Sequence, residues 1–114
     1  MQAVFTHAIK FVDDMDRAVT FYRDTLGLTL RFASPFWSEF ETGAVTLALH
    51  PASERNLAGS TQVGFTAPDL EAIYAGREAA DLTFTAPPVD EHGTLLSRLL
   101  DCEGAEIGLS GAHS

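Results

Sequence analysis

The chain has 114 residues, of which 46% are hydrophobic and 20% are charged, as in a folded, soluble protein with one modest core. Sixteen acidic and seven basic side chains give a net charge of −9. This excess argues against a nucleic-acid partner, which requires a basic surface, and against an anionic membrane surface. Cys102 is the only cysteine, so no disulfide can form within the chain, and a reducing, cytoplasmic location is expected. No signal peptide or transmembrane segment is expected either.

The first half of the sequence predicts the order β-α-β-β-β. Residues 3–12 are rich in β-branched and aromatic side chains and predict a strand. Asp14 is a candidate N-cap for a helix over 15–26, where apolar residues recur at helical spacing and Gly27 follows. The remaining strands of this half are expected over 28–33, 36–41 and 44–50.

The second half predicts the same order after a polar linker at about 51–60. A strand over 61–66 is followed by a helix over 69–80 that Asp69 can cap. A short strand over 82–85 leads into a Pro87-Pro88 loop that runs to Gly93. The last strands are expected over 94–100 and 105–109, with a frayed tail over 110–114.

An altered internal repeat links the two halves. His7 precedes Asp14 by the same spacing at which Gln62 precedes Asp69, so His in the first copy has become Gln in the second. A tandem pair of like units predicts pseudo-twofold architecture with a binding cleft. We therefore expect a single domain over 1–114, with one module at about 1–52 and the other at about 60–110.

Two segments of the sequence carry a family resemblance. Phe21-Tyr-Arg-Asp-Thr-Leu-Gly-Leu28 closes the first helix, and Asp101-Cys-Glu-Gly104 turns into the last strand. With the β-α-β-β-β repeat, they resemble the vicinal oxygen chelate superfamily, which includes glyoxalase I, bleomycin-resistance proteins, fosfomycin-modifying enzymes and extradiol dioxygenases. The resemblance implies an α+β fold of two tandem β-α-β-β-β modules, in which eight strands form an open, curled cup with the helices outside. It also implies a homodimer.

The resemblance further implies four metal-ligand positions in the cup. His7 matches the first and Gln62 the third, while an alignment of residues 43–47 with 104–108 assigns Leu47 to the second and Gly108 to the fourth. A catalytic zinc ion usually has three protein ligands. One imidazole and one amide fall short of that number, so neither a bound metal nor another cofactor is expected.

Strand alternation predicts which side chains share the cup face with His7. Glu39 and Arg98 occupy matching places in the repeat, and either pair with each other or contact a ligand. Trp37 either stacks on a ligand or belongs to the core, and His7 is a hydrogen-bonding residue, an inert buried histidine or a catalytic base. No catalytic residue is assigned. The expected ligand pocket consists of His7, Trp37, Glu39, Leu47, Gln62, Arg98, Glu106 and Gly108.

Two classes of function remain open. The leading hypothesis is a metal-independent small-molecule-binding protein of the glyoxalase/bleomycin-resistance type, which sequesters a toxin or an antibiotic, with a cationic or neutral aromatic ligand favoured by the carboxylates of the cup. The alternative is a metal-dependent lyase, isomerase, dioxygenase or thiol transferase of the same superfamily. An enzyme that uses His7 as a base without a metal is a third candidate, although no partner residues for it are recognisable.

Overall fold

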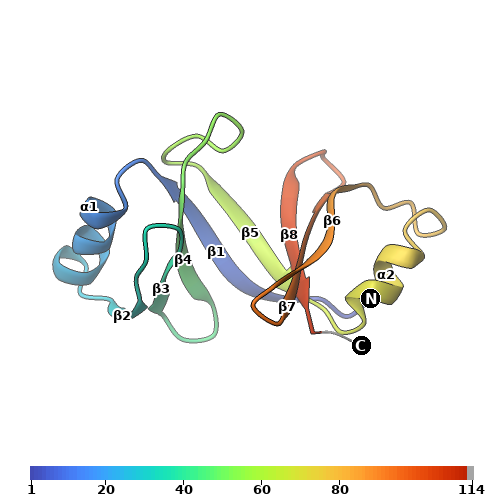
Figure 1. Ribbon diagram of the computed structural model, residues 1–114, viewed down its shortest axis with the longest axis horizontal. Coiled ribbons are helices and arrows are strands. Elements are labelled where there is room, and N and C mark those ends of the chain that lie inside the picture. The colour runs from blue at the N-terminus through green and yellow to red at the C-terminus, as the bar shows by residue number, and fades with distance from the viewer. Residues whose placement is uncertain (113–114) are drawn as a thin grey trace. The chain divides into compact units, whose positions relative to one another are not determined.

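The computed structural model describes residues 1–112, and each half of the chain has the order β-α-β-β-β (Figure 1). The α+β fold class and the tandem modules are therefore confirmed. The elements are β1 (Val4–Val12), α1 (Met15–Thr20), the π-helical segment η1 (Phe21–Thr25), β2 (Thr29–Phe32), β3 (Ser38–Glu41), β4 (Thr46–Pro51), β5 (Thr61–Thr66), α2 (Leu70–Ala75), β6 (Phe84–Glu91), β7 (Thr94–Leu100) and β8 (Glu106–Gly111). No helix within 1–112 has the length and apolarity that a bilayer crossing needs.

Contacts divide the chain into two compact units. One comprises Thr6–Gln62 and is called the first module; the other comprises Met1–Phe5 and the chain from Val63 onward and is called the second module. The linker expected at 51–60 lies within the first module. The Gly59 amide donates to the Phe11 carbonyl at 2.9 Å, and the Lys10 ammonium donates to the Gly59 carbonyl at 3.0 Å.

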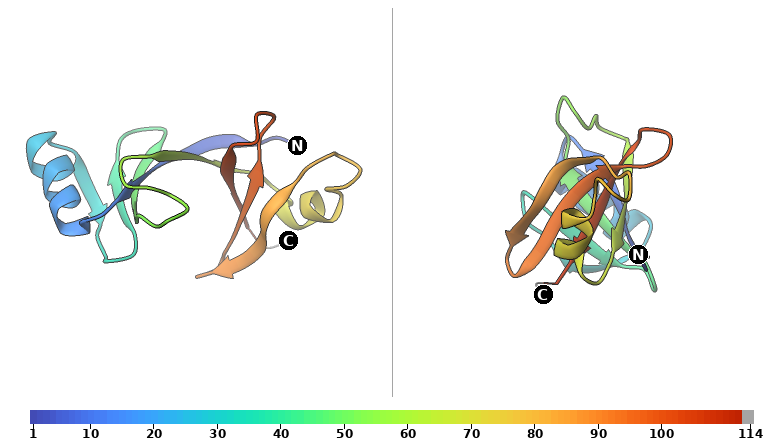
Figure 2. Two further views of the ribbon diagram at one scale, coloured as in Figure 1. Left: turned by 90° about the horizontal axis from the view of Figure 1, so that it is seen from above. Right: turned by 90° about the vertical axis from the view of Figure 1, so that its right-hand side faces the viewer.

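The first module contains a sheet with the strand order β2-β3-β4-β1, in which β1 and β4 are parallel and the other pairs are antiparallel. Helix α1 lies against this sheet beside β4 (Figure 2). Its buried Val19 packs with Phe40 of β3 and Leu49 of β4 to form the core of the module. One face of the sheet is thus covered by α1, and the opposite face is called the helix-free face of the first module.

The first helix begins as the sequence predicts but changes its winding. Asp14 is the N-cap, and its carboxylate accepts a hydrogen bond from the Arg17 amide at 3.0 Å. The predicted α-helix over 15–26 is α-helical only as far as Thr20. The next turn is π-helical, with the Leu26 amide bonded to the Phe21 carbonyl at 3.1 Å. Such wide turns are inserted into α-helices, and apolar spacing alone does not distinguish them.

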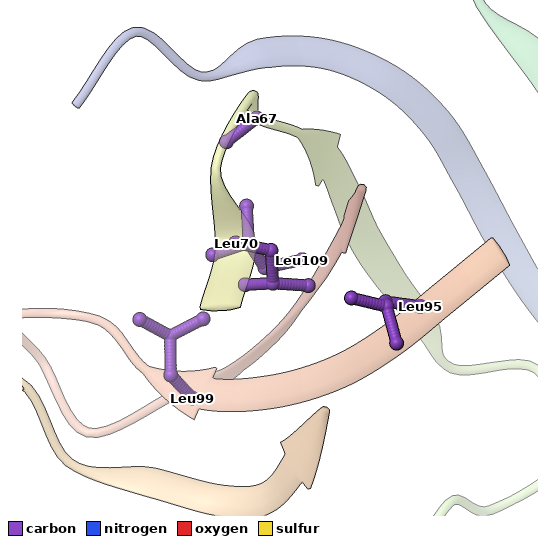
Figure 3. Packing of buried hydrophobic residues seen from close by; sticks show 5 residues of the cluster. All are labelled: Ala67, Leu70, Leu95, Leu99 and Leu109. Atoms are coloured by element: carbon purple, nitrogen blue, oxygen red, sulfur yellow. The ribbon is translucent and has the colours of Figure 1, made fainter. Parts of the chain in front are cut away.

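The second module contains a sheet with the order β5-β8-β7-β6, in which β5 and β8 are parallel. Helix α2 contacts β6 and β8 on one face, and the opposite face is called the helix-free face of the second module. Figure 3 shows Leu70 of α2 beside Leu109 of β8, with Leu95 and Leu99 of β7 completing the core together with Ala67. Each module thus has one small core, formed by its helix and its own four strands.

The second half departs from the prediction at β6. Residues 86–93 were expected to form a Pro87-Pro88 loop, but the strand continues to Glu91. Because β6 is the terminal strand of its sheet, prolines without an N–H group are tolerated there. The pairing with β7 shifts register between Ala86 and Val89, the interval that contains both prolines. A proline that points toward β7 cannot donate to it, which explains the shift.

The ends of α2 and β8 also differ from expectation. Asp69 adopts the left-handed conformation with φ 56° and makes no side-chain cap, and α2 ends at Ala75 rather than near residue 80. Strand β8 continues to Gly111, because Ser110 is anchored by its hydroxyl to that of Thr66 at 3.0 Å. The whole tail over 110–114 was expected to fray. Its last two residues, 113–114, lie outside the described residues.

Candidate functional site

The helix-free face of the first module gathers aromatic, imidazole and charged side chains. The register of β1 with β4 pairs His7 with Thr46, and Ala48 lies opposite Glu39 of β3. Paired residues in a sheet project to the same side. The residues of this face are His7, Ile9, Phe11, Arg31, Trp37, Glu39, Glu41, Thr46, Ala48 and His50.

Trp37 is held in place by polar and aromatic contacts. Its indole N–H donates to Oε1 of Glu39 at 2.8 Å. Its ring centroid lies 6.4 Å from that of His7 and 6.1 Å from that of His50, the latter in an edge-on arrangement. His50 is half-buried and also contacts Phe11 edge-on. The tryptophan therefore stands between two imidazoles on a half-buried surface.

Glu39 is paired within its own module. Arg31 donates to Oε2 of Glu39 at 2.7 Å, to Oε2 of Glu41 at 2.5 Å and to the Thr46 hydroxyl at 3.2 Å. This guanidinium and the Gly43 amide hold the pKa of the Glu41 carboxyl below its ordinary value. Arg31 was missed in the sequence because its partners lie on two other strands. Alternation from the buried Phe40 across to β2 could have placed it on this face.

His7 is a neutral imidazole near neutral pH. Burial lowers its pKa from the ordinary value of 6.5; the negative charge of Glu39 opposes this shift, and the positive charge of Arg31 adds to it. Its Nδ1 is hydrogen-bonded to the Thr6 hydroxyl at 2.9 Å. A neutral imidazole has one donor nitrogen and one acceptor nitrogen, so Nε2 can bond to a polar group of a ligand.

Leu47 does not share this face, which corrects the sequence-based expectation. The register pairs it with Ala8 rather than with His7. Its side chain packs against the core of the first module, beside Phe40 and Leu49 under α1. Thr46 and Ala48 take the positions on the helix-free face that Leu47 was expected to occupy.

The strand registers show how the repeat aligns. Ile9, two residues after His7, pairs with Ala48, whereas Gly64, two residues after Gln62, pairs with Gly108. Ala48 is therefore the counterpart of Gly108. The connection from β3 to β4 spans residues 42–45 and that from β7 to β8 spans 101–105. The second connection is one residue longer, which accounts for the misplacement of Leu47.

The same registers confirm that Glu39 and Arg98 are counterparts. Glu39 pairs with Ala48, and Arg98 pairs with Gly108. In the second module, Arg98, Glu106 and Gly108 share the helix-free face, since Leu99 and Leu109 face the core. Oε2 of Glu106 accepts a hydrogen bond from the Thr85 hydroxyl at 2.6 Å. Gln62, at the start of β5, is 8% exposed and thus buried.

The first module alone fits a metal ion poorly. Its helix-free face offers the imidazoles of His7 and His50 and the carboxylates of Glu39 and Glu41 as possible ligands, but Arg31 already donates to both carboxylates and Trp37 donates to the second oxygen of Glu39. Within residues 1–112, no group of three or more His, Cys, Asp and Glu side chains is arranged to hold a metal. A catalytic zinc site usually needs three such ligands.

Comparison with solved structures supports the fold described above. A glyoxalase/bleomycin resistance protein/dioxygenase superfamily member from Vibrio splendidus 12B01 is 16% identical, with a TM-score of 0.69 over 96% of this chain and 97% of that one. The S115T variant of Streptomyces coelicolor methylmalonyl-CoA epimerase, in complex with 2-nitronate-propionyl-CoA, is 18% identical, with a TM-score of 0.77 over 97% and 95%. At these identities the likeness concerns the fold alone.

The sequence itself gives the family. No curated protein matches the chain significantly. The model of the Glyoxalase/Bleomycin resistance protein/Dioxygenase superfamily matches residues 4–109, nearly the whole chain, which includes both β-α-β-β-β modules. The chain therefore belongs to the glyoxalase/bleomycin resistance protein/dioxygenase superfamily.

Proposed function

We propose that the chain is a small-molecule-binding protein whose ligand contacts the helix-free face of the first module. The observation that carries this proposal is the fixed position of Trp37, held by Glu39 and flanked by His7 and His50. Ligand sites combine apolar walls with a few oriented polar groups. Trp37, Ile9 and Ala48 provide the apolar surface here.

The charges of this face favour a neutral or cationic aromatic ligand. Glu39 and Glu41 together carry two carboxylates, whereas Arg31 is the one guanidinium that neutralises them. A cation over a tryptophan ring contributes about 0.5–2 kcal/mol, depending on its desolvation. This contribution selects among ligands but does not by itself provide tight binding.

The proposal is tested with a panel of flat aromatic cations and their uncharged analogues. Trp37 is the only tryptophan, so its fluorescence reports binding directly, and isothermal titration then compares the variants. Trp37→Leu is expected to weaken binding about tenfold, through loss of the ring contact. Phe36→Leu serves as the control, because Phe36 is the adjacent aromatic residue in the sequence and is 77% exposed. Equal affinities of Trp37→Leu and the original protein would refute the proposal.

Sequestration of a toxin or an antibiotic in the cytoplasm, without a metal, is the form of this function that we favour. A sequestering protein releases its ligand unchanged, which mass spectrometry of the recovered compound measures. A chemically altered compound would instead indicate catalysis.

A metal-dependent enzyme of the same superfamily is the second candidate. The observation in its favour is the neutral imidazole of His7, whose Nε2 is suited to coordination. Solved structures of similar fold include methylmalonyl-CoA epimerase. Elemental analysis after dialysis against Ni²⁺, Zn²⁺ or Mn²⁺ separates the candidates, since about one equivalent per chain that His7→Ala removes would favour the enzyme.

A further inference from the structure

The second module has a charged group that none of its described residues neutralises. Arg77 and Arg98 are its two arginines, and it has no lysine. Arg77 donates to the Tyr74 carbonyl at 2.9 Å, and its guanidinium lies 4.0 Å from the centre of the Tyr74 ring. Arg98 is also half-buried, but no residue of this module that the structure describes forms a hydrogen bond or an ion pair with it. A guanidinium stays protonated in proteins, so Arg98 is a partly buried cation.

Comparison of the two modules shows why this charge has no partner among the described residues of its own module. Glu39 of the first module is the counterpart of Arg98. Strand β2 shifts register at Arg31, and the first of the two register shifts of β6 lies at the equivalent residue, Thr85. Both residues contact equivalent positions, since Arg31 donates to Thr46 and Thr85 donates to Glu106. Arg31 neutralises Glu39, whereas the uncharged Thr85 cannot neutralise Arg98.

The cross-strand neighbours of Arg98 are small. They are Ala86 on β6 and Gly108 on β8, and Gly108 pairs in turn with Gly64 on β5. None of the three has a side chain longer than a methyl group. Among the described residues of this face, Glu106 has the carboxylate near Arg98, and that carboxylate accepts a hydrogen bond from the Thr85 hydroxyl at 2.6 Å. These three neighbours therefore place no bulky side chain of their own beside the guanidinium.

We propose that Arg98 is an oxyanion-binding residue and that the helix-free face of the second module accepts a carboxylate or a phosphate group. Arginine binds such groups through two parallel N–H···O contacts, which a lysine or a neutral residue cannot reproduce. The net charge of −9 repels anions at long range, so recognition depends on this local contact. The inference concerns the second module and holds whether or not Trp37 of the first module binds an aromatic compound.

The test uses the arginine Nε–H signals in the NMR spectrum of the intact protein. Sodium phosphate and sodium acetate are titrated separately at constant ionic strength, so that one probe represents each oxyanion class. The Arg98 signal is expected to shift and saturate, while the Arg77 signal stays fixed. Arg98→Gln is expected to weaken binding about tenfold or more, as loss of a charge-assisted bidentate contact requires. Arg77→Gln is the matched control and should leave the affinity unchanged.

A second variant keeps the proposal testable if Arg98→Gln fails to fold. Glu106→Gln removes the neighbouring negative charge and should tighten binding severalfold, whereas a purely structural role of Arg98 would give no such gain. Absence of a saturable shift with both anions would overturn the proposal. Equal shifts of Arg98 and of the exposed Arg17 would overturn it too, because they indicate nonspecific screening. Since the signal comes from the second module, failure here is distinct from failure of the Trp37 titration.

Discussion

The imidazole of His7 is subject to opposing influences that a titration can separate. Burial and Arg31 lower its pKa, while Glu39 raises it. We predict that Glu39→Gln lowers the His7 pKa further, because the charge that favours the imidazolium is removed. The measurement is an NMR titration of the His7 ring signals in both proteins. An unchanged or higher pKa in the variant would contradict the electrostatic reading of this face.

The lowered pKa of His7 makes the free energy of unfolding decrease toward acidic pH. Because the folded protein disfavours the charged imidazole, the unfolded chain binds the proton more readily between the lowered pKa and 6.5. Stability therefore falls as the pH drops below 6.5 and approaches the folded value. When the pH is lowered from about 7.5 to about 5.5, the free energy of unfolding should fall less in His7→Gln than in the original protein. Urea unfolding at the two pH values measures this difference.

At the scale of elements, the packing of α2 on its sheet depends on Gly111. A Cβ atom at this position would lie 2.7 Å from the Ala67 carbonyl oxygen and 3.0 Å from Cβ of Leu70. Gly111→Ala must therefore push α2 away from β8, and we predict a loss of about 1–3 kcal/mol in unfolding free energy. Urea unfolding measures this loss.

Gly76→Ala is the matched control for that measurement. The added Cβ would lie 3.5 Å from the Ala72 carbonyl oxygen, an ordinary contact. The backbone at Gly76 has φ −91°, which alanine adopts without strain. Its stability should be unchanged or slightly higher. Similar losses in both variants would show that the effect does not arise from close packing at Gly111.

The sequence predicts element types well, because alternation and helical spacing are local properties. The bounds of β5 and β7 match the structure fully, and the Asp14 cap forms as expected. Leu47 was misplaced for a reason that is not local. Its face depends on the pairing of β4 with β1, and a difference of one residue in a connecting loop reverses that face.

Part of the candidate site was predicted because the alternation of side chains along one strand is a local property. His7, Trp37 and Glu39 lie together on one face, and Arg98, Glu106 and Gly108 on another, each within a module. Arg31 was missed because its partners, Glu39 and Thr46, lie on two other strands. Such contacts between strands depend on register, which a single sequence does not fix.

At the scale of the whole molecule, we predict a homodimer. Several large apolar side chains are exposed, among them Phe36 at 77%, Val4 at 62% and Val89 at 52%. Burial of such side chains against a second copy would stabilise a dimer by about 25 cal/mol per Å² of apolar surface. Light scattering at micromolar concentration is expected to give twice the chain mass of 12.3 kDa. A mass of 12.3 kDa would refute the prediction.

The two prolines of β6 affect how a second copy of this chain could associate with the β6 edge of the sheet. Consecutive residues of a strand direct their backbone N–H groups to opposite sides, so one of Pro87 and Pro88 removes a donor toward β7 and the other removes a donor from the outer edge. An extended peptide that approached this edge would find one of its carbonyl groups without a hydrogen-bond donor. The edge is thus a poor template for the strand-by-strand growth that leads to fibrils. Association through β6 must then rely on side-chain contacts. The two prolines thus protect this edge of the sheet against polymerisation by added strands.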